Sequence, residues 1–340
     1  MTPPLIVEAK VEAFLDARGL GEGPITSTRI GDGGGSNFTF LIERGGERYV
    51  LRRPPRPPLP PTAHDMVREA NLQEAIRAAG FTRLAELLAV CEDESVLGVP
   101  FYVTRYIDGH VITQTLPPGI DRRRLGEDLV DALVEIHAAD VTTPKLAAFA
   151  RTGSYLERQV KRFAQLWELN KTRELPAVDE VSATLARELP DPLPSTVVHG
   201  DFRLGNMMVA RDEPTRIEAV LDWEMGAIGD PRADVGYLLA TYSEPGGAQN
   251  PLGSSPVTAE PGFPTRAELA QRYAEQSGRA VEPLAWFEAL ALWKAAVFCE
   301  AIYGRYIRGE LAQEDTLAAR FETGVPLLAE TALERLGNRT

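Results

Sequence analysis

The sequence predicts an α+β protein with a small, strand-rich amino-terminal lobe and a larger, mostly helical carboxyl-terminal lobe. Between residues 25 and 106, short apolar segments separated by glycines and prolines are typical of β-strands. From residue 121 onward, apolar residues recur with the 3.6-residue period of helices. The length of 340 residues suits either two lobes or one large α/β unit. We favour two lobes, residues 1–104 and 105–340, with a hinge at about residues 104–109.

The composition is that of a soluble globular protein, with 44% hydrophobic and 25% charged residues. A net charge of −13 argues against a general nucleic-acid binder, which would carry a basic patch, but it permits phosphate ligands whose charge is offset locally. No apolar run is long enough to span a membrane, and the first 20 residues carry charges where a signal peptide needs an apolar core. Cys91 and Cys299 are far apart in the sequence and are expected to be reduced thiols. We therefore expect a cytoplasmic protein that binds neither nucleic acid nor membranes.

The amino-terminal lobe is expected to begin with an amphipathic helix over residues 5–18. A three-strand meander should follow, because two glycine-containing turns separate apolar segments at residues 25–30, 38–42 and 48–53. The first turn, residues 31–37, contains three consecutive glycines whose backbone amides could approach phosphate oxygens closely. Glycine-rich turns also join many hairpins, so this loop does not establish a phosphate site by itself.

A proline-rich run over residues 54–61 follows the meander and is interpreted as a stiff, extended connector, with a polyproline ligand as the alternative. The next predicted helix covers residues 65–79. It carries Glu69, 17 residues after Arg52, which could pair with that cation or could be an ordinary solvated helix charge. Strands at residues 87–90 and 100–106 complete the lobe.

The carboxyl-terminal lobe is expected to consist mainly of helices. They are predicted over residues 121–139, 155–169, 176–187, 235–242, 266–277, 284–308 and 313–336. Asp234 directly precedes the fourth helix and is expected to cap it. The stretch 244–264 is rich in Gly, Pro and Ser and is expected to be a mobile surface loop. The aromatic residues of 284–308 could line an acceptor cavity or pack in the helical core, and we favour packing.

Three polar residues that can carry chemistry lie among short buried strands in the second half of the chain. The strands are predicted at residues 197–198, 207–209 and 218–221, and Asp201, Asn206 and Asp222 lie where these strands end or loops turn. An H-x-D-x-x-x-x-N pattern, followed by an aspartate after a strand, supplies one proton acceptor and two oxygen ligands for Mg²⁺. These are the groups that phosphoryl transfer needs.

These motifs resemble those of the aminoglycoside phosphotransferase and choline kinase-like family of small-molecule kinases, a branch of the bilobal protein-kinase-like fold. Within that family, the chain most resembles the phosphotransferase domain that some eukaryotes fuse to acyl-CoA dehydrogenases, and its stand-alone bacterial relatives. The resemblance spans nearly the whole chain, and its most specific parts are HGDFRLGN at residues 199–206, LDWE at 221–224, and GDP at 229–231 with Asp234. Supporting segments, in the family's order, are residues 33–40, 50–55, 68–69 and 106–109.

The resemblance implies a role for each candidate site residue. Asp201 would orient the acceptor hydroxyl and take up its proton, while Asn206 and Asp222 would hold Mg²⁺. Arg52, paired with Glu69, would replace the phosphate-binding lysine that is common in kinases, although its planar fork is not equivalent to an ammonium. The nucleotide would be contacted by Gly34, Gly35, Ser36, Asn37 and Arg52 at its phosphates, and by the backbone of Arg105 and Ile107 at adenine.

Several neighbouring residues have a structural interpretation beside a functional one. Strand alternation places Arg53 on the face opposite to Arg52. His199 is expected to be a structural hydrogen-bonding group, and Asp230, like Asp234, is expected to cap or brace a loop. Two alternatives stay open: Arg203 could contact substrate or form a salt bridge within its loop, and Glu224 could approach a second metal or face solvent.

The implied activity is ATP- and Mg²⁺-dependent transfer of a γ-phosphoryl group to a hydroxyl of a small molecule. A hydroxy acid or hydroxyacyl metabolite is the favoured acceptor by resemblance. One alternative is a kinase of aminoglycoside or macrolide antibiotics. Another is a catalytically silent nucleotide-binding module, which the arginine at position 52 keeps open. The sequence leaves the oligomeric state open, including a homodimer.

Overall fold

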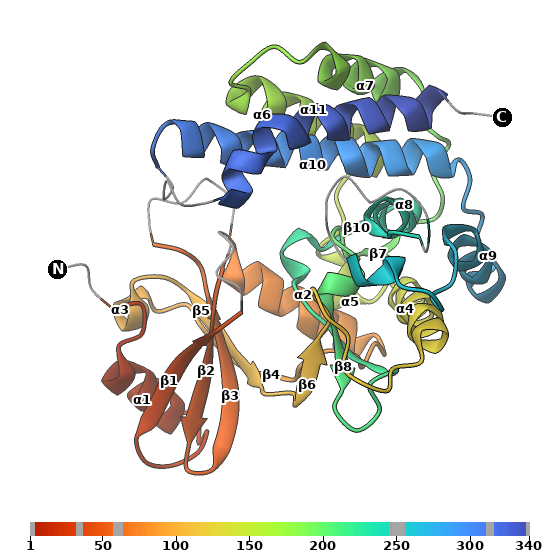
Figure 1. Ribbon diagram of the computed structural model, residues 1–340. Coiled ribbons are helices and arrows are strands. Elements are labelled where there is room, and N and C mark those ends of the chain that lie inside the picture. The colour runs from red at the N-terminus through yellow and green to blue at the C-terminus, as the bar shows by residue number, and fades with distance from the viewer. Residues whose placement is uncertain are drawn as a thin grey trace. The chain divides into compact units, whose positions relative to one another are not determined.

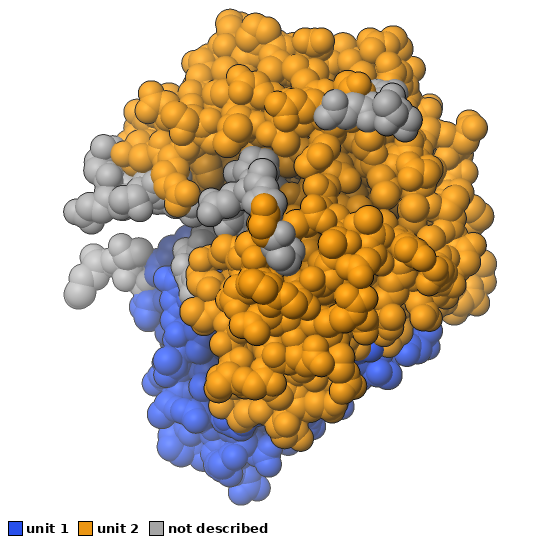
Figure 2. Space-filling view, turned by 45° about the vertical axis from the view of Figure 1, so that its right-hand side comes forward, with its two compact units in different colours: residues 1–109, 222–226 blue, residues 110–221, 227–340 orange. Residues whose placement is uncertain are grey.

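The computed structural model describes residues 4–31, 37–56, 64–244, 246, 256–310 and 316–337. These residues form two compact units, shown in different colours in Figure 2. Unit 1 comprises residues 1–109 together with 222–226, and unit 2 comprises residues 110–221 and 227–340. Unit 1 is built around an antiparallel sheet and unit 2 is mostly helical, so the predicted α+β class is confirmed.

Unit 1 contains a five-stranded antiparallel sheet with the order β1-β2-β3-β5-β4 (Figure 1). Its strands are β1 (Ile25–Ile30), β2 (Phe38–Arg44), β3 (Glu47–Arg53), β4 (Leu87–Cys91) and β5 (Phe101–Arg105). The predicted meander is confirmed, since β1 pairs with β2 and β2 with β3. Gly45 and Gly46 form the β2–β3 turn with φ values of 56° and 85°, which only glycine adopts without strain.

Helices cover both faces of this sheet. Successive side chains along each strand point to opposite faces, so each face presents apolar residues to a helix. On one face, α1 (Glu8–Asp16) contributes Phe14 to a core that includes Leu51 and Phe101. On the other face, α2 (Met66–Ala78) packs Met66 and Ala70 against Tyr102. Arg52 is the cross-strand partner of Tyr102 and therefore shares the α2 face. A four-residue helix, α3 (Glu94–Leu97), was not predicted.

Unit 2 contains two small sheets that support loops. A three-stranded sheet has the order β6-β8-β9, and a two-stranded antiparallel sheet pairs β7 with β10. The strands are β6 (Gly109–Val111), β7 (Thr196–Val198), β8 (Met207–Ala210), β9 (Ile217–Val220) and β10 (Ala227–Gly229). The sequence did not predict β6 or β10, because three residues are too few to show a period.

The helices of unit 2 agree with most of the predicted ranges. They are α4 (Arg122–His137), α5 (Pro144–Ala147), α6 (Tyr155–Asn170), α7 (Pro176–Arg187), α8 (Arg232–Thr241), α9 (Arg266–Ser277), α10 (Leu284–Ile307) and α11 (Thr316–Gly337). The start predicted for α8 was wrong, since the helix begins three residues earlier and follows Pro231 without a side-chain cap. Proline suits this end because a first-turn amide has no partner within the helix. Asp234 lies in the first turn of α8 and is therefore not its cap.

The core of unit 2 surrounds α10, which runs beside α11 and also contacts α8 (Figure 1). Trp286 and Trp293 are fully buried, so core packing is confirmed for them, whereas Phe298 is 41% exposed and Tyr303 and Tyr306 are partly buried. The stretch expected to be a loop contains a short 3₁₀ helix, Pro256–Ala259, and its residues 245 and 247–255 lie outside the described part of the chain. Within the described ranges, no helix has both the length and the apolar character needed to cross a membrane.

Candidate active site

The predicted site residues fall into two groups, one in each unit, and each group has its own hydrogen-bond network. Arg52, Glu69 and Asp222 come together in unit 1. Asp201 and Asn206 come together in unit 2. Gly34, Gly35 and Ser36, predicted to contact phosphate, lie outside the described residues.

The centre of the unit 1 group is Arg52 on β3, whose guanidinium serves two carboxylates at once. Its Nε lies 3.4 Å from Glu69 Oε1, and its Nη2 donates to Asp222 Oδ1. The planar fork of arginine makes this double pairing possible, whereas the point charge of lysine would favour one partner. The predicted pairing of Arg52 with Glu69 is present, and the pairing with Asp222 is an addition.

Burial and charge act in opposite directions on this group. Burial tends to lower the pKa of Arg52, but the carboxylates of Glu69, Asp222 and Glu224 raise it above its usual value and keep the guanidinium charged. Burial raises the pKa of Glu69, whose side chain is only 2% exposed, and the positive charge of Arg52 opposes that shift. The Tyr102 hydroxyl donates to Glu69 Oε1 at 2.8 Å. Glu69 is therefore held by a hydrogen bond from Tyr102 as well as by the charge of Arg52.

Two polar atoms of this group have unused hydrogen-bonding capacity. Within the described part of the chain, neither Arg52 Nε nor Glu69 Oε2 has a hydrogen-bond partner, and both atoms are buried. A buried donor without a partner is costly unless a ligand or water satisfies it. The charged Arg52 thus fits an anionic ligand such as a phosphate oxygen.

Asp222 is held in a backbone conformation that is uncommon for a residue other than glycine. Its φ and ψ are both 66°, in the left-handed region, at the entrance to a 3₁₀ helix, Trp223–Met225. The fully buried Trp223 packs edge-on against Phe81, and Arg68 donates to the Gly226 carbonyl at 2.6 Å. These contacts stabilise the turn and so direct the Asp222 carboxylate toward Arg52.

The remaining predicted nucleotide contacts of unit 1 are engaged within the protein or lack a distinguishing feature. Asn37 Nδ2 donates to Glu224 Oε2 at 3.0 Å, and Asn37 Oδ1 lies 2.9 Å from His64 Nδ1. Glu224 therefore does not simply face solvent. Arg105 pairs with Glu86 through its exposed side chain, while the adenine role predicted for its backbone and for Ile107 stays a prediction.

In unit 2, Asp201 and Asn206 are tied together through one amide group. Asn206 Nδ2 donates to both the carbonyl and Oδ2 of Asp201, each at 2.8 Å. Arg203 Nε lies 3.3 Å from Asp201 Oδ1, so Arg203 forms the salt bridge within its loop that the sequence left open. Because the nitrogen of Asn206 is committed, its Oδ1 is the atom that remains for a cation. A carboxamide oxygen is a suitable hard ligand for Mg²⁺.

Asp234 fixes the loop that carries Asp201. Its fully buried carboxylate accepts from the amides of His199 (2.7 Å) and Gly200 (2.8 Å) and lies 3.2 Å from His137 Nε2. Burial would raise the pKa of Asp234, but these hydrogen bonds and the nearby histidines lower it overall. Asp234 is thus a loop brace, as one of its two predicted roles had it.

His199 has the structural role that was predicted for it. Its Nδ1 lies 3.2 Å from the Asp201 amide, which can only donate, so Nδ1 is the acceptor. Its Nε2 then donates to the Leu221 carbonyl at 2.9 Å. The imidazole thereby links the Asp201 loop to the strand end that precedes Asp222.

Two residues near Asp201 were missed by the sequence analysis. Tyr237 lies close to the Asp201 carboxylate, and burial together with that charge raises the pKa of Tyr237. Lys294 on α10 is 7% exposed, and burial lowers its pKa to about 8. Tyr237 follows Asp234 by three residues and so lies on the same helix face, a spacing from which its position near the Asp201 loop could have been predicted. Lys294 is the only charged residue of the apolar run 289–299, and a lone charge in such a run could have marked it as a candidate.

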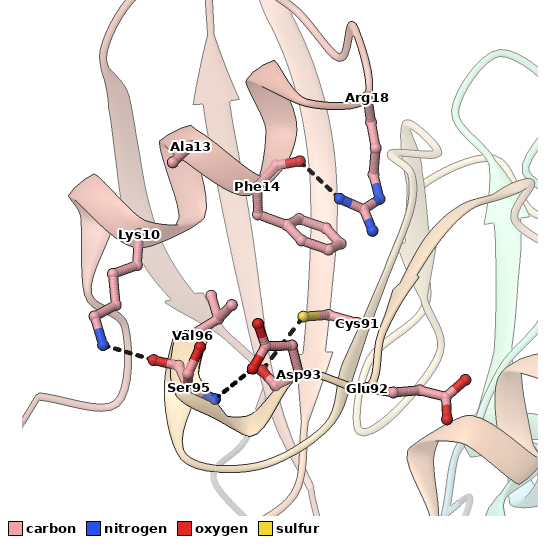
Figure 3. A pocket seen from close by; sticks show the side chains of 9 residues that line it. All are labelled: Lys10, Ala13, Phe14, Arg18, Cys91, Glu92, Asp93, Ser95 and Val96. Atoms are coloured by element: carbon pink, nitrogen blue, oxygen red, sulfur yellow. Dashed lines mark hydrogen bonds between the residues drawn. The ribbon is translucent and has the colours of Figure 1, made fainter.

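One cavity of unit 1 lies on the α1 side of the sheet. It has a volume of about 560 Å³ and is lined by residues of α1, α3 and the end of β4 (Figure 3). Its cations are already used by backbone carbonyls: Lys10 donates to Ser95 at 2.6 Å and Arg18 to Phe14 at 3.1 Å. It contains none of the predicted site residues.

The described residues contain no cluster of three or more His, Cys, Asp or Glu side chains arranged to hold a metal. Mg²⁺ does not need such a cage, since it is usually held by one or two carboxylates, water and substrate phosphates. Asn206 in unit 2 and Asp222 in unit 1 each offer a hard oxygen donor of the kind that Mg²⁺ takes, and their role as its ligands stays a prediction.

Comparison with known proteins agrees with this chemistry. A model of the phosphotransferase enzyme family (APH) matches residues 27–287. Acyl-CoA dehydrogenase family member 11 of Mus musculus is 32% identical over 313 residues, which is 90% of this chain but 40% of that protein. The chain therefore spans about two-fifths of the length of this curated relative.

Solved structures share the fold over nearly their whole length. A provisionally assigned aminoglycoside phosphotransferase from Ralstonia eutropha is 26% identical, with a TM-score of 0.76 and coverage of 96% of this chain and 98% of that one. The aminoglycoside phosphotransferase APH(4)-Ia, solved as a complex with ADP and hygromycin B, is 15% identical, with a TM-score of 0.64 and coverage of 97% and 100%. The predicted kinase-like α+β fold is confirmed. Since the family model covers more than half of the sequence, the chain belongs to the phosphotransferase enzyme family, whose members transfer phosphoryl groups to hydroxyls.

Proposed function

We propose that this protein transfers the γ-phosphoryl group of ATP to a hydroxyl of a small metabolite, with Mg²⁺ as cofactor. The observation that carries the proposal is the shared network of Asp201 and Asn206. One carboxylate is held ready to accept a proton, and one carboxamide has its nitrogen committed and its oxygen available. The charged Arg52 in unit 1 supplies a phosphate-binding group.

In the proposed reaction, the acceptor oxygen attacks the γ-phosphorus, the bond from that phosphorus to the β-phosphate oxygen breaks, and ADP leaves. Asp201 accepts a hydrogen bond from the acceptor hydroxyl, orients it, and takes its proton as the new P–O bond forms. Arg203 and Asn206 hold the Asp201 carboxylate in place through hydrogen bonds. Mg²⁺, bound by Asn206 and Asp222, would neutralise phosphate charge. Arg52 would bind phosphate oxygens by charge-assisted hydrogen bonds.

The comparisons support the nucleotide and the class of acceptor indirectly. APH(4)-Ia binds ADP, which supports an adenine nucleotide here. The name of the curated relatives, acyl-CoA dehydrogenase family members, supports a hydroxy acid or hydroxyacyl acceptor in a protein of related metabolism. The preference for this acceptor rests on similarity to these relatives, and the chain matches part of the length of each.

The test is the variant Asp201→Asn, assayed for ADP release and for the phosphorylated product with a panel of hydroxylated metabolites. Removal of a proton acceptor is expected to lower transfer by about 10²–10⁴-fold. The thermal unfolding temperature should stay close to that of the wild type, because asparagine preserves the shape of the side chain. Asp212→Asn, at an exposed turn, is the matched control and should keep full activity. Full transfer by Asp201→Asn would remove Asp201 from the mechanism, and ATP binding without turnover of any acceptor would favour a silent nucleotide-binding module.

A further inference from the structure

Lys294 is a buried cation beside the loop that carries Asp201. It lines a small cavity in unit 2 together with Gly200 of that loop, Tyr237 of α8, Tyr155 of α6 and apolar residues of α10. The volume of this cavity is about 10 Å³, which is room for a single water-sized atom. The cavity can therefore hold one oxygen atom but not a whole metabolite.

Within the described part of the chain, no carboxylate lies at ion-pair distance from the ammonium of Lys294. Its Nζ lies 4.9 Å from the centroid of the Phe163 ring. Burial of an unpaired ammonium is expensive, and replacement by a hydrophobic residue of similar shape is often neutral or stabilising. Retention of a lysine in this apolar helix therefore needs a reason other than stability.

We propose that Lys294 binds an anionic oxygen group of the acceptor, so that the acceptor is a hydroxylated anion such as a hydroxy acid. This inference rests on the proposed phosphotransferase function and specifies its substrate class. Gly200 and Tyr237 connect the two sites: both line the Lys294 cavity, Gly200 directly precedes Asp201 in the chain, and Tyr237 lies close enough to feel the Asp201 charge. An acceptor could then place a carboxylate oxygen at Lys294 and its hydroxyl at Asp201.

The same geometry disfavours a polycationic acceptor. An ammonium group in the cavity would meet the positive charge of Lys294 with no neighbouring carboxylate left to pair with it. Asp234 is already engaged by the His199 and Gly200 amides, and Asp201 by Arg203 and Asn206. An aminoglycoside would need acidic groups at this end of the site.

The kinetic test uses Lys294→Met with matched pairs of acceptors. The panel consists of 3-, 4- and 5-hydroxyalkanoates of increasing chain length, the corresponding neutral hydroxyalkanamides, and kanamycin. The wild type should prefer the acid over the amide, and kcat/KM for the acid should fall by about 10–100-fold in Lys294→Met, as expected for a lost hydrogen bond to a charged group. The acid-to-amide preference should disappear while KM for ATP is unchanged. Lys161→Met, on the exposed part of α6, is the control and should behave as the wild type.

The pH profile separates a binding role from a structural one. Lys294 loses its charge as pH rises through its pKa of about 8, so KM for the hydroxyalkanoate should increase above that pH. The charged groups around it are Asp234 and Asp201, which favour its ammonium form, and Arg162, which opposes it. The tyrosines of the cavity, Tyr155 and Tyr237, have raised pKa values and stay neutral in this range. In Lys294→Met the rise in KM above pH 8 should be absent.

A binding measurement distinguishes failure of this inference from failure of the proposed function. Thermal unfolding is followed with the same acids and amides in the absence of ATP, for the wild type and for both lysine variants. Stabilisation by acids that is lost in Lys294→Met supports the inference even if no acceptor is phosphorylated, in which case the proposed function alone has failed. Turnover with equal acid-to-amide ratios in wild type and Lys294→Met, a wild-type preference for kanamycin, or no effect of any acid in either assay would overturn the inference.

Discussion

Arg52 and Arg53 are adjacent in the sequence but lie on opposite faces of the sheet and have different roles. Arg53 is 2% exposed and donates to the backbone carbonyls of Leu5 and Pro54, on the α1 face of the sheet. Arg52 lies on the α2 face and pairs with the carboxylates of Glu69 and Asp222. The alternation of side chains along β3 separates a structural arginine from one that can bind phosphate.

Arg52→Lys should weaken nucleotide binding with little effect on stability. A single ammonium cannot reproduce the fork that reaches two carboxylates and still donate to phosphate. We expect KM for ATP to rise about tenfold, which corresponds to about 1.4 kcal/mol, measured by initial rates or by titration with a non-hydrolysable nucleotide. Arg53→Lys is the comparison: it should lower the unfolding temperature and leave KM for ATP unchanged. An Arg52→Lys variant with wild-type KM and lowered stability would assign Arg52 a structural role.

Sequence reasoning at the residue scale found the groups that belong to local motifs. Asp201, Asn206 and Asp222 could be predicted because their spacing and the flanking strands are visible in one stretch of chain. Tyr102 could not, since it meets Glu69 only through the pairing of β5 with β3, which places it opposite Arg52. Lys294 could not be assigned to a site either. It lies 94 residues after Gly200 in the sequence, and only helix packing brings the two together.

At the scale of elements, α8 links the helical core of unit 2 to the Asp201 loop. Asp234 accepts two hydrogen bonds from that loop, and Tyr237, three residues later on the same helix, lies close to the Asp201 carboxylate. Gly236, between them, lies against α10, and a Cβ there would be 2.5 Å from the Cβ and 2.6 Å from the carbonyl carbon of Phe287. Such close approach of two helices requires glycine, and it sets where Asp234 and Tyr237 are presented.

Gly236→Ala should therefore destabilise the protein and impair transfer together. The added methyl group collides with backbone as well as side chain, and overpacking of this kind costs about 1–3 kcal/mol, to be measured by denaturant unfolding. Activity should fall by more than the loss of folded protein explains. A displaced α8 would move Asp234, which braces the Asp201 loop, and Tyr237, which lies beside the Asp201 carboxylate. Gly324→Ala in α11 is the matched control, with only Phe321 Cδ1 near, at 3.8 Å. It should be neutral or stabilising by up to about 1 kcal/mol. Equal stability of the two variants would contradict the close-packing argument.

The elements themselves were largely predictable, and their ends were less so. Long periodic helices such as α4 and α10 were found because their apolar faces repeat over several turns. The start of α8 was misplaced because Asp234 was taken as a cap, whereas its carboxylate is used by a loop distant in sequence. Tertiary hydrogen bonding overrode the local signal there.

At the scale of the whole molecule, unit 1 is discontinuous in sequence. Residues 222–226 belong to it although they follow β9 of unit 2 in the chain. Trp223 anchors this segment against Phe81, and Gly226 lies so close to Leu72 that a Cβ would be 2.4 Å from its Cδ2. The change from strands to helices along the sequence predicted two lobes with one boundary. A single boundary cannot describe a segment that returns to the first unit, because that return depends on long-range packing.

Trp223→Ala should therefore damage unit 1 and nucleotide binding, although position 223 is far along the chain. Loss of a fully buried tryptophan costs about 3–5 kcal/mol, and release of the segment would free Asp222 from Arg52. We expect scanning calorimetry to show an early transition, and the thermal stabilisation by ATP with Mg²⁺ to be largely lost. Trp167→Ala, at an equally buried tryptophan of unit 2, should lower stability while that stabilisation persists. If both variants lost the response to ATP equally, the segment would have no special role in unit 1; a difference between them would locate nucleotide binding in the unit that the segment completes.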